Sequence, residues 1–164
     1  MEISIKHAYL SAAFAGVITV ALAGAVFAQA ADSQVGTWKL NVAKSTFSPG
    51  PAPKASVSKI EAAGAGVKVT VDQTPGEGAA IHYEFTAKYD GKDVPVTGNN
   101  PAADTVARTR VDANTVKTIG KKGGKVLTTQ LSVVSADGKT RTVTTTGVNP
   151  EGKTVHNVAV YDRQ

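Results

Sequence analysis

The sequence predicts an all-β fold, an antiparallel up-and-down meander that closes into a small barrel of about 8–10 strands. Apolar and polar residues alternate along many short stretches, most clearly over residues 81–90, and this alternation separates them onto the two faces of a strand. Turns that contain glycine separate these stretches, and no segment after residue 30 shows helical periodicity. Consecutive short turns imply antiparallel neighbours, and a long meander tends to curl and close. A two-sheet sandwich is the alternative.

Residues 1–30 are expected to be a secretory signal peptide, followed by one domain over residues 31–164. Lys6 and His7 give a positive start, residues 10–27 are nearly all apolar, and Ala28-Gln29-Ala30 matches a cleavage site. The protein is therefore expected to be exported, and to be periplasmic or secreted. An uncleaved anchor is the alternative, because the apolar run is nearly long enough to span a bilayer. After cleavage, no membrane span is expected.

About ten strands are expected along the domain, each recognised by its period-two pattern. They cover residues 37–42, 56–61, 67–72, 81–90, 93–97, 105–111, 115–121, 126–135, 140–148 and 154–162. Three prolines at alternate positions predict an irregular crossing segment over 45–53, because proline cannot donate a ladder hydrogen bond. Asp90-Gly91-Lys92 is typical of a hairpin turn, and Pro95 predicts an edge or bulged strand.

Composition excludes several kinds of site. The chain has no cysteine, which excludes thiol nucleophiles, cysteine–zinc sites and iron–sulfur clusters. Its net charge of +5 suits solubility or loose attraction to an anionic envelope surface. The lysines are scattered through turns, so nucleic acid is not an expected partner. No nucleophile elbow or phosphate-binding loop is present, and we expect neither an enzyme nor a cofactor.

Histidine and threonine each leave two interpretations open. His82, Glu84 and His156 could form a metal site with two histidines and one carboxylate. We favour the alternative, a solvent-facing position for His82 and Glu84 opposite Tyr83 and Phe85, and expect no metal. A second pattern places four threonines on one face of the strand over 140–148: Thr140, Thr142, Thr144 and Thr146. They suit an exposed strand face, and the alternative is a partly polar barrel interior.

Trp38 is the only tryptophan, and we expect it to floor the barrel. Gly36-x-Trp38 at the start of an all-β meander resembles the lipocalin/calycin superfamily, and the chain is most similar to lipocalin-like secreted bacterial proteins of uncharacterised function. The matching stretches are residues 36–41, 47–51, 87–92, 95–98 and 158–161. The resemblance covers most of residues 35–164. It implies that Gly36 and Trp38 are structural, with Trp38 at the closed end under an arginine from near the last strand. Arg163 is the only candidate for that arginine.

The candidate ligand site is built on arginine. Arg108 and Arg110 share a strand face with Val106, so all three point inward if Val106 does. Buried guanidinium groups need an anionic partner. Tyr161 and Arg163 could add a hydroxyl and a third cation, and Tyr83 and Phe85 suit an apolar tail.

These residues predict a non-enzymatic envelope protein that binds a small amphipathic or anionic ligand as a monomer. In the alternative arrangement Ala107 and Val111 face the core, and both arginines are solvated. The alternative function is an envelope or surface interaction module, or a structural one, with a filled barrel and no ligand.

Overall fold

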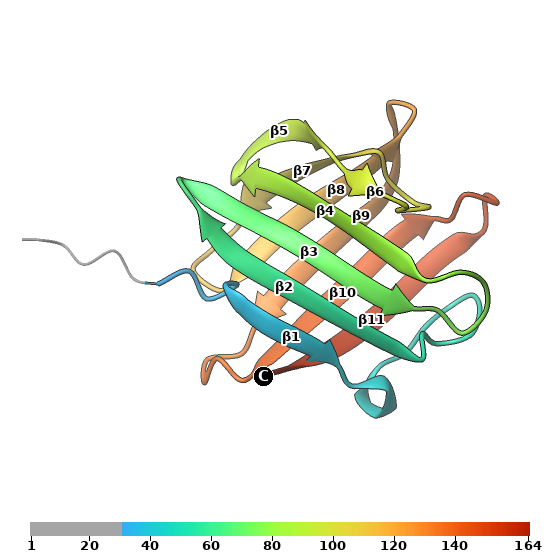
Figure 1. The fold of residues 1–164 in the computed structure, drawn as a ribbon, viewed down its shortest axis with the longest axis horizontal. Helices are drawn as coiled ribbons and strands as arrows, with labels where there is room; N and C mark the ends of the chain where they lie inside the picture. The colour runs from blue at the N-terminus through green and yellow to red at the C-terminus, as the bar shows by residue number, and fades with distance from the viewer. Residues whose placement is uncertain (1–30) are drawn as a thin grey trace, which may run out of the picture.

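The computed structural model describes residues 31–164, so the predicted signal peptide over residues 1–30 lies outside the described residues. The described chain forms an 11-stranded antiparallel sheet that is rolled into a nearly closed barrel (Figure 1). This confirms the predicted all-β meander and its closure. None of the helices among residues 31–164 is long and apolar enough to cross a membrane.

Each predicted stretch contains a strand. The strands are β1 (Gly36–Leu40), β2 (Ala55–Ala63), β3 (Gly66–Thr74), β4 (Ile81–Lys88), β5 (Asp90–Pro95), β6 (Thr97–Gly98), β7 (Thr105–Arg110), β8 (Thr115–Lys122), β9 (Lys125–Val134), β10 (Thr140–Val148) and β11 (Thr154–Arg163). A single 3₁₀ turn, η1 (Val42–Lys44), ends the first strand earlier than predicted. The additional strand arises because the predicted stretch over 93–97 divides between β5 and the two-residue β6.

The barrel closes in two places by different means. The first and last strands pair directly, with Trp38 opposite Arg163. Between β4 and β7 the closure is indirect, because β5 pairs with β7 and β6 returns to pair with β4. The predicted hairpin at Asp90-Gly91-Lys92 is therefore wrong, since β5 leaves β4 to satisfy the free edge of β7. The predicted irregularity around Pro95 is confirmed, because β5 is an edge strand whose register shifts between Asp90 and Asp93.

Trp38 lies at the closed end of the barrel and is 0% exposed. Its indole Nε1 donates to the backbone oxygen of Gln34 at 2.9 Å, and the Arg163 guanidinium lies 4.1 Å from the ring centroid. Arg163 also donates to the backbone oxygens of Ser33 and Val35, which holds the segment before β1 across the end of the barrel. The position implied for Trp38 under Arg163 is the one observed.

Gly36 is required by the same arrangement. Its φ of +147° is unfavourable for other residues, and a Cβ atom there would lie 2.3 Å from Nη1 of Arg163. The Gly-x-Trp pattern therefore has a direct steric cause, because a side chain at position 36 would displace the guanidinium that packs on Trp38.

Truncation of Trp38 should destabilise the barrel strongly. We expect Trp38→Ala to lower the free energy of unfolding by about 3–5 kcal/mol, the usual cost of deleting a buried large aromatic side chain. Leu131→Ala is the control, because Leu131 is 41% exposed on the outer surface; its cost should stay below about 1 kcal/mol. Denaturant unfolding measures both, and a loss for Trp38→Ala as small as that of the control would contradict the floor role.

Candidate ligand-binding cavity

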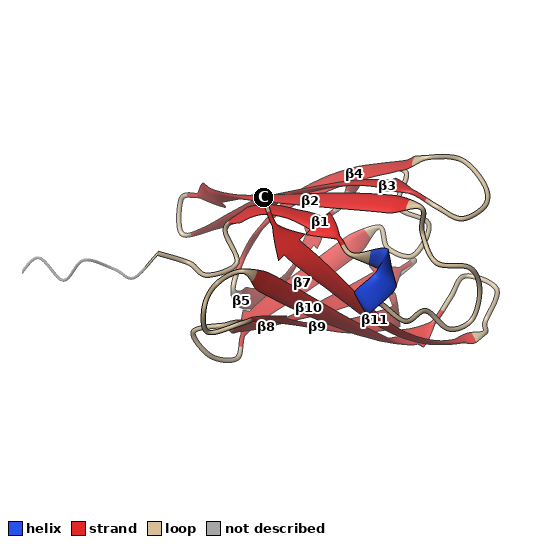
Figure 2. Ribbon diagram, turned by 90° about the horizontal axis from the view of Figure 1, so that it is seen from below, coloured by secondary structure: helices blue, strands red, loops and turns tan. Residues whose placement is uncertain are grey.

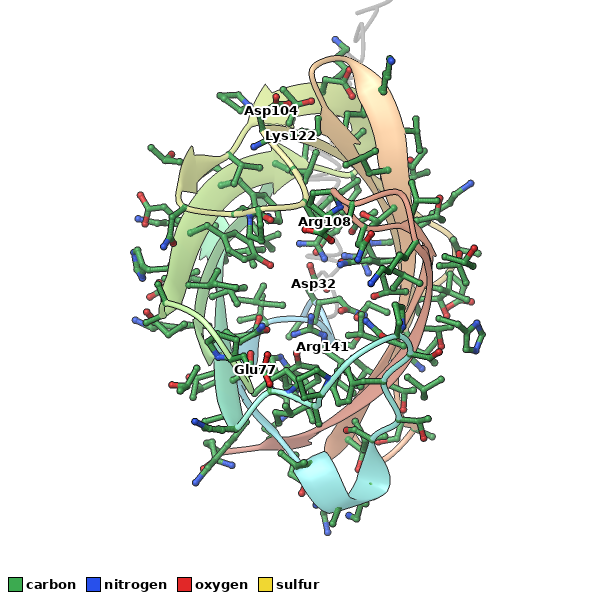
Figure 3. All side chains as sticks on the ribbon, turned by 90° about the vertical axis from the view of Figure 1, so that its right-hand side faces the viewer. Asp32, Glu77, Asp104, Arg108, Lys122 and Arg141 are labelled. Carbon is green, nitrogen blue, oxygen red and sulfur yellow. The ribbon has the colours of Figure 1, made fainter. Side chains whose placement is uncertain are left out.

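The barrel encloses a cavity of about 380 Å³. This is within the usual range for small-molecule sites, roughly 300–1,000 Å³. The cavity reaches the end of the barrel opposite Trp38, where its lining includes residues of three loops: Phe47, Pro49, Asn100, Pro101, Asn149 and Pro150. Figure 3 looks along the barrel from that end, with Arg108 and Arg141 inside it.

The two sides of the cavity differ in chemistry. Figure 2 shows β1–β4 on one side of the barrel and β7–β10 on the other. Strands β2–β4 line the cavity mainly with apolar side chains, namely Ile60, Val69, Val71, Ile81 and Phe85. Strands β7–β11 contribute most of the polar ones: Arg108, Thr118, Thr128, Gln130, Ser132, Arg141, Thr145 and Asn157. We refer to these two sets as the apolar wall and the polar wall.

Arg108 points into the cavity from β7 and is only 3% exposed. Its Nε and Nη1 atoms are sealed from solvent and have no hydrogen-bond partner among residues 31–164. The guanidinium lies 5.3 Å from the ring centroid of Tyr89 and 6.0 Å from that of Phe85. Burial lowers the pKa of Arg108, because apolar surroundings disfavour the charged form. Of the two arrangements that the sequence left open, the one with Val106 and Arg108 both facing inward is observed, and Arg108 is not solvated.

Arg141 is a second buried arginine that lines the cavity, and the sequence analysis missed it. It donates from Nε to the hydroxyl of Ser132 at 2.9 Å and from Nη1 to that of Ser58 at 3.2 Å. Ser132 in turn donates to the side-chain oxygen of the fully buried Gln34. Burial lowers the pKa of Arg141 to about 10, so the guanidinium remains charged at neutral pH. All these partners are neutral, and none offsets that charge.

Arg110 and Arg163 do not line the cavity. Arg110 pairs with Asp32 at 2.7 Å at the closed end, where its guanidinium also lies 4.0 Å from the Tyr89 ring centroid. Arg163 donates to three backbone oxygens around Trp38. The pairing expected between Arg108 and Arg110 in the cavity is therefore replaced by Arg108 and Arg141. The other candidates do line the cavity: Tyr83, Phe85 and Tyr161.

The carboxylate of Asp32 is engaged outside the cavity lining. Asp32 accepts hydrogen bonds from the Tyr89 hydroxyl and from Arg110. Although burial works to raise it, these hydrogen bonds hold the pKa of Asp32 below its usual value. Among residues 31–164, no aspartate or glutamate lines the cavity. The cavity therefore contains two guanidinium groups without a negative side chain to balance them.

The candidate metal ligands do not assemble. Nδ1 of His82 contacts Asp72 at 2.6 Å on the outside of the barrel, and Glu84 pairs with Lys68 at 2.8 Å. Within residues 31–164 the structure brings together no group of three metal-ligating side chains. The threonines at 140, 142, 144 and 146 are absent from the cavity lining, while Arg141, Val143 and Thr145 from the same strand belong to it. The interior is partly polar, but through the other face of that strand.

No protein-family model matches the chain, and no curated protein or solved structure was found to be similar to it. The nearly closed antiparallel barrel is compatible with a lipocalin-like fold.

Two tyrosines beside the cavity should resist ionisation. Burial is the main cause that raises the pKa of both Tyr83 and Tyr89 to about 12, and the hydrogen bond to Asp32 adds to it for Tyr89. Because the folded pKa exceeds the value of 10.0 for a free tyrosine, the associated stability is present below pH 10 and is lost as the pH rises toward 12.

We therefore expect the free energy of unfolding to fall above pH 10, and to fall less in Tyr83→Phe than in the unmodified protein. Phenolate absorbance should show the same groups ionising near pH 12. Ionisation of Tyr83 near pH 10 would mean that its ring is solvated and does not form part of the cavity wall.

Proposed function

We propose that this protein is a non-enzymatic, lipocalin-like binding protein of the cell envelope, exported by its N-terminal segment and periplasmic or secreted. Its ligand is a small amphipathic anion held inside the barrel. The observation that carries this proposal is the pair of buried guanidinium groups, Arg108 and Arg141, in a cavity that no acidic side chain among residues 31–164 lines.

The energetics favour an anionic occupant. A buried charge is costly unless it is paired and hydrogen-bonded, and Arg108 has neither an ion pair nor a partner for Nε and Nη1 among the described residues. A carboxylate, sulfonate or phosphate group in the cavity supplies the missing negative charge. Arginine suits such groups because its guanidinium stays charged and donates charge-assisted hydrogen bonds to carboxylate and phosphate oxygens. The apolar wall beside the arginines accommodates the remainder of an amphipathic molecule.

Binding is better supported than catalysis by the groups that line the cavity. No histidine, lysine, aspartate or glutamate among residues 31–164 is available there as a general base. The hydroxyls of Ser58 and Ser132 accept hydrogen bonds from Arg141, which is a cation and cannot take up a proton. A filled barrel without a ligand is disfavoured by the cavity itself. The monomeric state remains a prediction.

The proposal predicts charge-selective binding. Dodecanoate and 5β-cholanate, a linear and a ring-bearing carboxylate, should both bind residues 31–164 saturably, while the neutral alcohol dodecanol should bind more weakly. The single tryptophan, Trp38, reports occupancy because Arg141 lies 5.9 Å from its ring centroid. Arg108→Met and Arg141→Met should each weaken carboxylate binding by about tenfold or more, as expected for a lost charge-assisted hydrogen bond.

Lys117→Met is the matched control, because it removes the same charge from the exposed outer face of β8. It should leave the affinity unchanged. Binding that is indifferent to both arginine substitutions, or the absence of saturable binding by both carboxylates, would contradict the proposal.

A further inference from the structure

The polar wall contains a continuous row of side chains. Arg108 on β7 is opposite Thr118 on β8, and the pairing continues through Gln130 on β9 and Thr145 on β10 to Asn157 on β11. All five residues line the cavity. Neighbouring strands lie about 4.8 Å apart, so polar side chains follow one another at about this spacing from β7 to β11.

The opposite side of the cavity has a matching apolar row. Ile60 on β2 is opposite Val69 on β3, which is opposite Phe85 on β4. All three side chains are buried and line the cavity. The two chemistries are thus arranged face to face across the barrel, instead of being separated along its axis. A linear alkyl tail in this space would offer no hydrogen-bonding group to Thr118, Gln130 and Thr145.

We infer that the ligand is a rigid, ring-bearing oxoanion with its hydroxyl or carbonyl groups on one face. This inference rests on the proposed function and specifies the ligand class of the same site. The acid group lies against Arg108 and Arg141, the polar face lies against Thr118, Gln130 and Thr145, and the apolar face packs on Ile60, Val69 and Phe85. Hydroxyl or carbonyl groups on that face give Thr118, Gln130 and Thr145 hydrogen-bond partners, which an all-apolar ring system cannot provide.

The experiment compares two probes that differ only in their polar face. Cholate has its hydroxyl groups on one face of a rigid ring system, and 5β-cholanate is the same carboxylate without them. We expect cholate to bind residues 31–164 about tenfold more tightly than 5β-cholanate, as expected for hydrogen bonds that the site is built to make. Isothermal titration calorimetry and Trp38 fluorescence measure both affinities.

A substitution on the protein side tests the same contact. Thr118→Val combined with Thr145→Val removes two hydroxyls from the row at nearly constant side-chain volume. It should weaken cholate binding and leave 5β-cholanate binding unchanged, so that the preference between the two probes disappears. Thr144→Val is the matched control, because Thr144 is adjacent to Thr145 but does not line the cavity.

The outcomes separate this inference from the proposed function. Equal affinities for cholate and 5β-cholanate, or a preference for cholate that survives the double substitution, would overturn the polar-face inference while leaving a general carboxylate site intact. Failure of cholate, 5β-cholanate and dodecanoate to bind would overturn both.

Discussion

The packing of arginine against aromatic rings at the closed end is the interaction on which the rest of this barrel depends. The Trp38 ring packs against the guanidinium groups of both Arg163 and Arg141. The Tyr89 ring packs in the same way against those of Arg110 and Arg108. In each set one arginine is held at the closed end and the other lines the cavity. The aromatic rings that fill the closed end therefore also contact Arg108 and Arg141, the two cations inside the barrel.

The two arginines at the closed end and the two that line the cavity differ in how their charge is balanced. Arg110 has the carboxylate of Asp32, and Arg163 has backbone oxygens of the segment before β1 and of the turn after β9. Arg108 and Arg141 have aromatic rings, serine hydroxyls or no partner. A protein selected for stability alone would favour apolar side chains at such positions. The two charged side chains in the cavity are the observation on which the proposed anionic ligand rests.

The place of Trp38 under Arg163 followed from the resemblance to lipocalins. Alternation along the strands predicted that Arg108 shares a face with Val106, and both are buried, but it left open which face is the inner one. Alternation could not predict how far along the barrel axis each inward side chain lies. Arg110 is two residues from Arg108 on the same strand face, yet it lies at the closed end, where it pairs with Asp32 from a distant part of the chain. The inward position of Arg141 could not be predicted, because β10 alternates threonines with Arg141, Val143 and Thr145, and this pattern does not show which face is buried. The return of β5 onto β7 depends on a free strand edge that exists only after the barrel curls.

The most direct test of the central claim is the stability of the ligand-free protein when the unpaired charge is removed. Residues 31–164, freed of bound molecules by unfolding and refolding, are compared with Arg108→Met by denaturant unfolding. If Arg108 is retained for a ligand, the variant should be at least as stable as the unmodified protein, because a buried charge without a counter-charge opposes folding. A loss of more than about 2 kcal/mol, the upper range of a desolvated cation–π contact, would identify Arg108 as a structural cation and contradict the claim.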